Sequence, residues 1–142
     1  MIKQISVFLA NEPGSLKNVT ELLKNANIDI RALTVAETGD YGVLRLILSD
    51  PDSGMDTLKK AGISAKENDV LGVQLTDQPG GLHQVAESVS ADKLNIEYVY
   101  PFITKTPGKA VVILRTNDIQ KAEKVLKGKG YKILEQEEIY DI

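Results

Sequence analysis

The sequence has no cysteine and no tryptophan, and its single histidine is His83. Without cysteine the chain cannot form disulfides, thiolate nucleophiles, iron–sulfur clusters or cysteine zinc sites. One histidine leaves almost no material for a histidine metal site or for a Ser-His catalytic pair. No apolar run approaches the roughly 20 residues that cross a bilayer, and the first residues lack the apolar core of a signal peptide.

Charge of neither sign dominates the 142 residues, which carry 17 Lys plus Arg against 20 Asp plus Glu for a net charge of -3. This balance argues against a protein that binds the phosphate backbone of nucleic acid. Hydrophobic residues at 42% and charged residues at 26% are typical of globular chains. We therefore expect a soluble cytoplasmic protein that is not an enzyme, needs no cofactor or metal, and binds neither nucleic acid nor a membrane.

The sequence contains an internal repeat, with one unit present in two copies. A shift of 66 positions places Asn11-Glu12-Pro13-Gly14-Ser15-Leu16 on Asp77-Gln78-Pro79-Gly80-Gly81-Leu82. The alignment needs no gap up to Asp52, which falls on Asp118, and the second copy then gains two residues. Further aligned pairs are Val19 with Val85, Ile30 with Ile96, Gly42 with Gly108, Ile47 with Ile113, Leu48 with Leu114 and, after the insertion, Gly62 with Gly130. We predict two tandem units, residues 1–70 and 71–142.

The first copy alternates strand and helix patterns. Ile5, Val7 and Leu9 alternate with their neighbours as in a strand, and apolar residues then recur at helical spacing over roughly 14–25. Asn11 is expected to cap this helix, with the proline that follows in its first turn. The segment 43–48 is apolar on both faces except at Arg45, which predicts a central strand. The other predicted elements are strands over 29–37 and 65–71 and a short helix around 55–61.

The second copy repeats this order. Its predicted elements are strands over 71–75, 95–102 and 110–114, helices around 82–89 and 119–126, and a closing strand from Ile133 onward. The order β-α-β-β-α-β predicts an α+β, ferredoxin-like unit with two helices on one face of an antiparallel sheet. Units of ~70 residues bury little surface alone, and the uncovered face or edge of each sheet needs a neighbour. We therefore expect the two units to pack on each other and the chain to form a homodimer.

Three common uses of this fold do not fit the residues. A metal-carrying version needs Cys-x-x-Cys in the first loop, and there is no cysteine. An acylphosphatase-like version needs an arginine in that loop, whereas the arginines are Arg31, Arg45 and Arg115. An RNA-binding version needs aromatic residues on the central strands, and the third strand of the first copy has none.

The two Pro-Gly loops carry a resemblance to a known family. Each loop, with the helix after it and the segment that enters the second strand (Asn27-Ile28-Asp29-Ile30 and Leu94-Asn95-Ile96-Glu97), resembles the ACT domains, which are amino-acid-sensing regulatory modules. In both copies the loop leucine and the strand isoleucine are 14 positions apart, as in the family pattern. The resemblance covers the whole chain as two tandem units with no catalytic domain attached.

The resemblance implies that a free amino acid binds where the first loop of one unit faces a neighbouring unit. The residues implied in ligand binding are Asn11, Glu12, Pro13, Gly14, Ser15, Leu16 and Asp29 in the first copy, and Asp77, Gln78, Gly80, Gly81, Leu82 and Asn95 in the second. Independently of the family, a glycine lets a ligand approach the backbone, and free N–H groups at a helix start hold a carboxylate. By resemblance, the ammonium would be held by side chains such as Asn11 and Asp29.

Some features depart from the family pattern or have simpler explanations. Leu9 and Leu75 stand where some members carry a histidine, so the identity of the amino acid stays open. Ser15 differs from Gly81, so one loop can bind ligand while the other is structural. An ordinary strand-to-helix turn is the alternative for each loop. We expect His83 to face solvent.

Two functions follow from these observations. The first is a non-catalytic amino-acid sensor, in which the ligand shifts quaternary structure or partner affinity. The alternative is a regulatory subunit that docks on an amino-acid biosynthetic enzyme.

Overall fold

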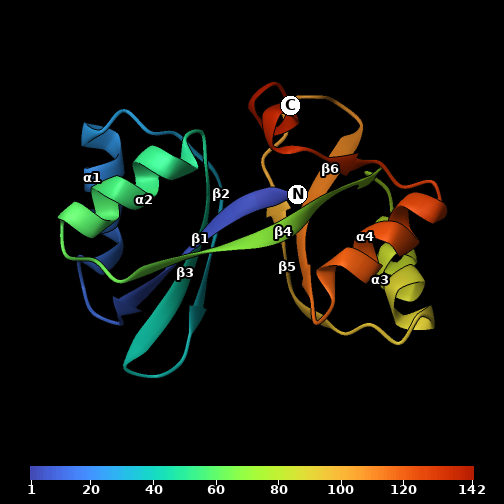
Figure 1. Cartoon of the computed structure of the whole chain (residues 1–142), viewed down its shortest axis with the longest axis horizontal. Helices are drawn as coiled ribbons and strands as arrows, with labels where there is room; N and C mark the ends of the chain where they lie inside the picture. The colour runs from blue at the N-terminus through green and yellow to red at the C-terminus, as the bar shows by residue number, and fades with distance from the viewer. The chain divides into compact units, whose positions relative to one another are not determined.

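The computed structural model describes all 142 residues and divides into two compact units (Figure 1). The N-terminal unit comprises Lys3–Asn68. The C-terminal unit comprises Asp69–Ile142 together with Met1–Ile2. None of the helices is both long and apolar enough to span a membrane.

The N-terminal unit has the predicted order of strands and helices. Its elements are β1 (Ile2–Ala10), α1 (Ser15–Asn25), β2 (Ile30–Glu37), β3 (Tyr41–Leu48), α2 (Pro51–Lys60) and the first residues of β4 (Ala65–Thr76). The strands follow the order β2-β3-β1-β4, and β3 pairs antiparallel with both β1 and β2. The predicted central position of this strand is therefore confirmed.

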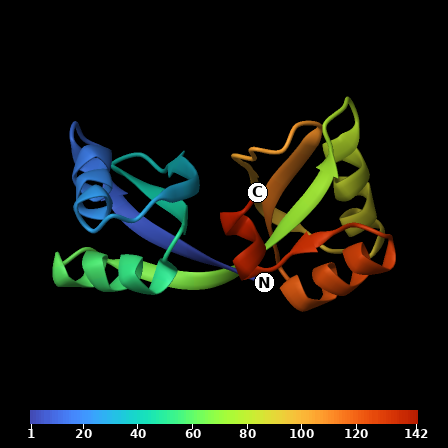
Figure 2. The same ribbon diagram turned by 90° about the horizontal axis from the view of Figure 1, so that it is seen from above.

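Both helices of the N-terminal unit cover the same face of its sheet (Figure 2). The register places Ile5 opposite Leu46 and Val7 opposite Leu44, so these four side chains share a face. They form one buried cluster with Val19 and Leu23 of α1 and Leu58 of α2, together with Ile28 and Leu48. The ferredoxin-like prediction is confirmed for this unit.

The C-terminal unit repeats the arrangement from the second part of β4. Its further elements are α3 (Gly81–Ala91), β5 (Ile96–Phe102), β6 (Lys109–Thr116), α4 (Ile119–Gly128), β7 (Ile133–Leu134) and the short 3-10 helix η1 (Gln136–Tyr140). β4 pairs with β6 on one side and with β7 on the other, and β6 pairs with β5. Val85 and Val89 of α3 and Leu126 of α4 pack on Leu71 and Leu114 of the sheet.

The first two residues of the chain are part of the C-terminal unit. A Cβ atom on Gly72 would lie 2.5 Å from Cδ1 of Ile2 and 3.4 Å from Cβ of Leu134, so a glycine is needed here for both side chains to pack over the strand. Ile2 is fully buried. The Met1 ammonium lies 2.9 Å from Oε2 of Glu135 and lowers the pKa of that carboxyl.

Two strand predictions were wrong in extent. The sequence predicted one strand that ends at Leu71 and another that begins there, whereas β4 is a single strand of 12 residues without a turn. The predicted closing strand from Ile133 onward has only two residues, because η1 follows it. Glu135 and Glu138 form a capping box that starts η1, and the burial of Ile139 holds it in place.

The position of the two-residue insertion in the second copy was also wrong. Ala36 pairs with Val43, and Phe102 pairs with Val111, so the offset between copies grows from 66 to 68 inside the hairpin. After the hairpin, Asp50 therefore corresponds to Asp118. A hairpin loop accepts extra residues at little cost, whereas an insertion in a packed helix would rotate its buried face.

Candidate ligand-binding site

Both Pro-Gly loops end in a glycine that caps the following helix in the left-handed conformation. Gly14 has φ 89° at the start of α1, and Gly80 has φ 90° at the start of α3. A Cβ atom on either glycine would meet no atom within 4 Å, so the space beside both corners is open. Other residue types are strained at such φ values, which explains the glycine in both copies.

The first turns of α1 and α3 leave backbone N–H groups without acceptors. In α1 these belong to Leu16 and Lys17, and in α3 to Leu82 and His83, since neither helix has a side-chain cap. Such N–H groups, at the positive end of the helix dipole, are suited to bind a carboxylate. His83 is exposed, as predicted.

The other two helices, α2 and α4, have side-chain caps at their N-termini. Asp50 accepts a hydrogen bond of 3.0 Å from the backbone N–H of Ser53 at the start of α2. Asp118 does the same for Lys121 at the start of α4, also at 3.0 Å. Hydrogen bonds from the backbone and side chain of Ser53 lower the pKa of Asp50. The contrast shows that the chain satisfies two helix starts with aspartates and leaves the two Pro-Gly starts open.

Asn11 does not cap α1, contrary to the sequence prediction. Its Nδ2 donates to the main-chain oxygen of Gly39 at 2.8 Å, and its backbone N–H donates to the oxygen of Asp40 at 2.8 Å. The side chain therefore ties the loop to the β2–β3 turn, and Gly14 takes the cap position because the Pro-Gly pair separates Asn11 from the helix. The Oδ1 atom of Asn11 keeps its capacity to accept a hydrogen bond.

A small pocket of ≈ 150 Å³ lies beside the first loop, and we call it the loop pocket. Four residues predicted from the sequence line it: Asn11, Glu12, Ser15 and Leu16. Pro13 and Gly14 belong to the same loop and are exposed, but they do not line the pocket.

The sequence reasoning missed the strand side of the loop pocket. Val35 and Glu37 of β2 and Gly42 of β3 line it, and Gly42 pairs with both Leu9 and Glu37. A residue without a side chain at this point of the sheet leaves the space that the pocket occupies. The available signal was a glycine within an apolar strand, which marks a close approach of backbone or ligand.

The loop pocket combines groups for both charges of an amino acid. Glu12 and Glu37 supply carboxylates that suit an ammonium group, and Leu9, Leu16 and Val35 supply apolar surface. The free N–H groups of the first turn suit a carboxylate. No group of three or more Asp, Glu or His side chains is placed to hold a metal ion.

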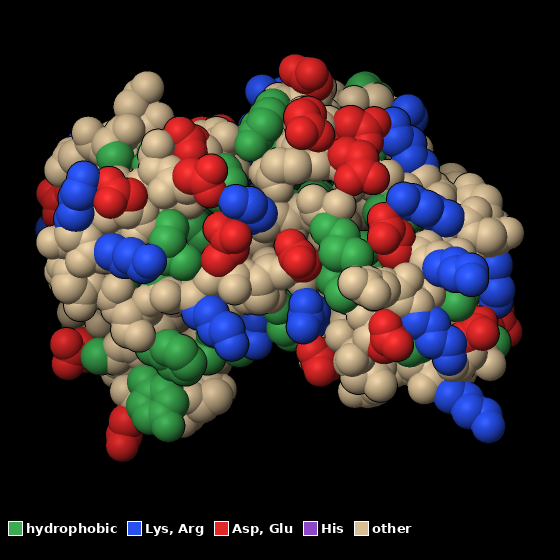
Figure 3. All heavy atoms as spheres, in the orientation of Figure 1, with side chains coloured by type: hydrophobic (Ala, Val, Ile, Leu, Met, Phe, Trp, Pro, Cys, Tyr) green, Lys and Arg blue, Asp and Glu red, His purple; other side chains and the backbone are tan.

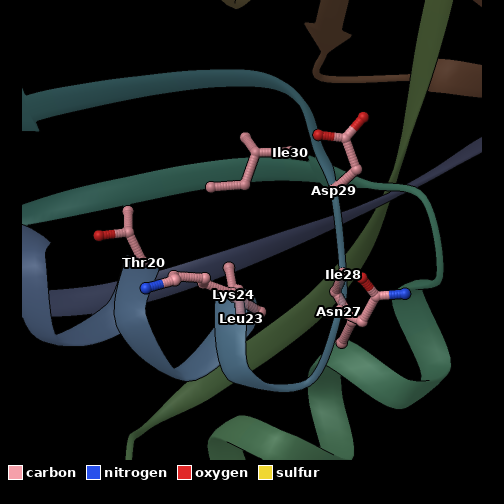
Figure 4. Close-up of a pocket in the computed structure, with 7 residues that line it drawn as sticks. All are labelled: Thr20, Leu23, Lys24, Asn27, Ile28, Asp29 and Ile30. Atoms are coloured by element: carbon pink, nitrogen blue, oxygen red, sulfur yellow. The ribbon is translucent and has the colours of Figure 1, made fainter.

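Asp29 lies at the other end of α1, in a second pocket of ≈ 390 Å³ (Figure 4). We call this the corner pocket; it is lined by Thr20, Leu23, Lys24, Asn27, Ile28, Asp29 and Ile30. The Asp29 carboxylate is 69% exposed and lies 3.4 Å from Nη1 of Arg31. The 11 residues of α1 put about 16 Å between its two ends, so the structure does not bring Asn11 and Asp29 together in one unit.

Comparison with known proteins decides the family. A family model described as an ACT domain pair matches residues 1–142. The chain belongs to the ACT domain pair family. No curated protein matches the sequence.

Solved structures share the fold of this chain. Protein BT0572 from Bacteroides thetaiotaomicron is 38% identical, with a TM-score of 0.91 over 99% of this chain and 96% of that one. The regulatory subunit of aspartate kinase from Thermus thermophilus is 14% identical, with a TM-score of 0.65 over 89% and 91%. That of Thermus flavus is 16% identical, with a TM-score of 0.61 over 88% of both chains. The last two show a shared fold only.

The second ACT unit has a different loop. A Cβ atom on Gly81 would collide with the main-chain oxygen of Thr76, so this position cannot carry the serine found at position 15. Asp77, Gln78 and Leu82 are exposed, and only Gly81 of the predicted set lines a cavity there. At the far end of α3, the backbone N–H of Asn95 donates to Oδ1 of Asn117 at 2.8 Å, as that of Asp29 donates to Oγ of Ser49 at 2.9 Å.

Proposed function

We propose that this protein is a non-catalytic regulatory protein that binds a free amino acid at its Pro-Gly loops, with residues 1–70 and 71–142 as its two ACT units. The observation that carries the proposal is the contrast between helix starts. The chain caps α2 and α4 with aspartates and leaves donors open only at α1 and α3. Those donors would hold the α-carboxylate of the ligand.

In this proposal the ammonium group of the ligand binds to side-chain oxygen atoms that line the loop pocket. Glu12 and Glu37 line the pocket, and Oδ1 of Asn11 is available as a further acceptor. In the second loop Asp77 and Gln78 supply the side-chain oxygens, and Asn95 takes the place of Asp29. Asp29, about one helix length away from its own loop, would contribute to the site of a neighbouring ACT unit.

A second copy of the chain is the neighbour that we propose. Leu16 and Val35 line the loop pocket, and Leu33 lies on the same face of β2 as Val35; the three are 41%, 48% and 43% exposed. Apolar surface gathered beside a binding site is typical of a surface that a partner covers. A ligand bound across this boundary would stabilise the dimer by about 2.7 kcal/mol at a hundredfold excess over its Kd.

Isothermal titration calorimetry with each of the twenty amino acids tests the proposal. We expect one amino acid, or a few of similar chemistry, to bind, and Asn11→Ala to weaken this binding about tenfold, which is 1.4 kcal/mol. Asn11→Asp keeps an oxygen acceptor but loses the donor to Gly39, so it separates ligand contact from loop support. The matched change Asp77→Ala reports on the second loop, and the stoichiometry per chain counts the loops that bind. Binding by none of the twenty would contradict the proposal.

An exposed apolar pair on the sheet favours the second candidate function, docking on an amino-acid biosynthetic enzyme. Phe8 and Tyr41 are 58% and 54% exposed. They share a face of the sheet, because Tyr41 pairs with Ala10, two residues from Phe8. The corresponding residues of the second copy, after the hairpin insertion, are Gln74 and Lys109.

The two copies therefore supply the test of docking. Phe8→Gln and Tyr41→Lys give the N-terminal unit the residues of the C-terminal one. If docking is the function, this double variant should lose a catalytic chain that co-purifies with the wild type, and it should keep its amino-acid binding unchanged. Absence of any larger chain in the wild-type purification would remove the support for docking.

A further inference from the structure

A surface cavity of ≈ 570 Å³ lies entirely within the C-terminal unit, and we call it the basic cavity. It is formed where four parts of the unit meet: the end of β4, the start of α3, the start of β6 and the segment that joins α4 to β7. In Figure 1 the end of β4 and the α4–β7 segment lie at the same end of this unit. The volume falls in the range of about 300–1,000 Å³ that is usual for small-molecule sites.

Positive charge predominates in the lining of the basic cavity. Lys109, Lys129 and Lys132 line it, and no carboxylate does. Lys109 and Lys129 make no ion pair, whereas Nζ of Lys132 lies 2.6 Å from Oε1 of Glu138. Figure 3 shows Lys and Arg side chains along the α4 side of this unit, with Asp and Glu side chains among them. In a chain with a net charge of -3, this local excess marks a place that attracts anions.

Sheet pairing holds two of these lysines in place. Lys109 lies opposite Thr76 in the β4–β6 register. The backbone N–H of Gln74 donates to the main-chain oxygen of Lys132 at 3.0 Å. The side chains of Thr76, Gln74, Gln84 and Tyr131 also line the cavity and offer neutral hydrogen-bonding groups. A ligand with both charge and hydroxyl or amide groups would find partners for each.

The N-terminal unit does not carry this charge. With the hairpin insertion taken into account, Lys109 corresponds to Tyr41, and Lys129 and Lys132 correspond to Ala61 and Ser64. All three lysines are therefore specific to the second copy. The basic lining of this cavity is a feature of the C-terminal unit alone.

We propose that the basic cavity binds a small organic anion with two or more negative charges, either a phosphate-bearing metabolite or a polycarboxylate. Lys109, Lys129 and Lys132 provide the cationic contacts, as lysines commonly do for phosphate and carboxylate groups. This site is separate from the loop pocket of the N-terminal unit. Because Gly81 of the second Pro-Gly loop also lines the basic cavity, the proposal is independent of amino-acid binding at the first loop only.

Calorimetric titration of the full chain with ADP and with citrate tests this site. The variant Lys109→Ala, Lys129→Ala, Lys132→Ala removes three charges from the cavity. The matched control Lys59→Ala, Lys66→Ala, Lys124→Ala removes three charges from exposed lysines that do not line the basic cavity and make no ion pair. We expect the cavity variant to weaken binding at least about tenfold and the control to change it less than about twofold.

Each outcome decides the proposal. Binding of ADP alone would identify a phosphate-bearing ligand, and binding of citrate alone a polycarboxylate, provided that the cavity variant loses it. Binding of neither probe, binding that survives in the cavity variant, or an equal loss in the control variant would overturn the proposal. At the first Pro-Gly loop, amino-acid binding by the cavity variant should match that of the wild type, so failure of this site and failure of the proposed function are distinguishable.

Discussion

Replacement of Gly14 by alanine separates the two roles that the first Pro-Gly corner combines. The residue has φ 89° and caps α1, and the space beside it is open. An added methyl group would therefore meet no protein atom. It would add bulk at the cap position, close in sequence to the residues whose free N–H groups, those of Leu16 and Lys17, would hold the carboxylate in our proposal.

The loss of stability can be worked out from the backbone. An L-residue in the left-handed region costs about 1–2 kcal/mol. Alanine has less conformational freedom than glycine in the unfolded chain, and this offsets the cost by about 0.4–1 kcal/mol. The net loss should be about 1 kcal/mol, which lowers the Tm by about 2–4 °C for a chain of this size.

Gly62 supplies a matched control for this variant. It has φ 73°, a Cβ atom would also meet nothing within 4 Å, and it follows the end of α2. Gly14→Ala and Gly62→Ala should therefore lose similar stability in thermal denaturation. Only Gly14→Ala should weaken amino-acid binding in calorimetry, by about tenfold, or 1.4 kcal/mol.

Equal binding by both variants and the wild type would refute the role of the open corner. An equal loss of binding in both variants would show that binding follows stability in general. Either result would leave the α1 start as an ordinary strand-to-helix turn.

Three further predictions concern the caps, the second loop and the pH dependence. Asp50→Ala and Asp118→Ala should each lower the free energy of unfolding by about 1 kcal/mol in urea denaturation, because each removes a helix cap. Gly81→Ser should destabilise the chain by more than either, since its Cβ atom collides with the main-chain oxygen of Thr76; an unchanged Tm would contradict this. The N-terminal ammonium lowers the pKa of Glu135. The stabilisation from this ion pair is therefore present at neutral pH and is lost as the pH falls below 4.5, the ordinary pKa of a glutamate. Glu135→Gln should accordingly flatten the acid limb of a curve of Tm against pH.

The fold was accessible from the sequence because the pattern occurs twice. Alternating and helical spacings around Ile5 and Val19 predict elements that a single copy would leave ambiguous, and the second copy repeats them. The apolar segment 43–48 predicted a central strand, and β3 indeed pairs with a strand on each side and buries Leu44 and residues 46–48. Element order and the shared helix face therefore follow from local periodicity.

Details that depend on long-range pairing were not accessible. The strand registers show that the two extra residues of the second copy lie in its β5–β6 hairpin. The sequence alone allows Gly42 to be aligned either with Gly108 or with Ala110, and no local pattern decides between the two alignments. The pairing of β2 with β3 also places Glu37 opposite Gly42 and therefore at the loop pocket. The hydrogen bond of Asn11 to Gly39, which removed it from the cap position, joins residues 28 positions apart.

The unbroken β4 strand restricts how this chain can change in length. Because side chains alternate between faces, inserting or deleting one residue near Asn68 would turn Leu71 and Val73 out of the core they now fill. Deletions and added tags are therefore best tolerated in the β5–β6 hairpin, where the two copies already differ by two residues. A fusion point or a circular permutation should begin there rather than at the midpoint of the sequence.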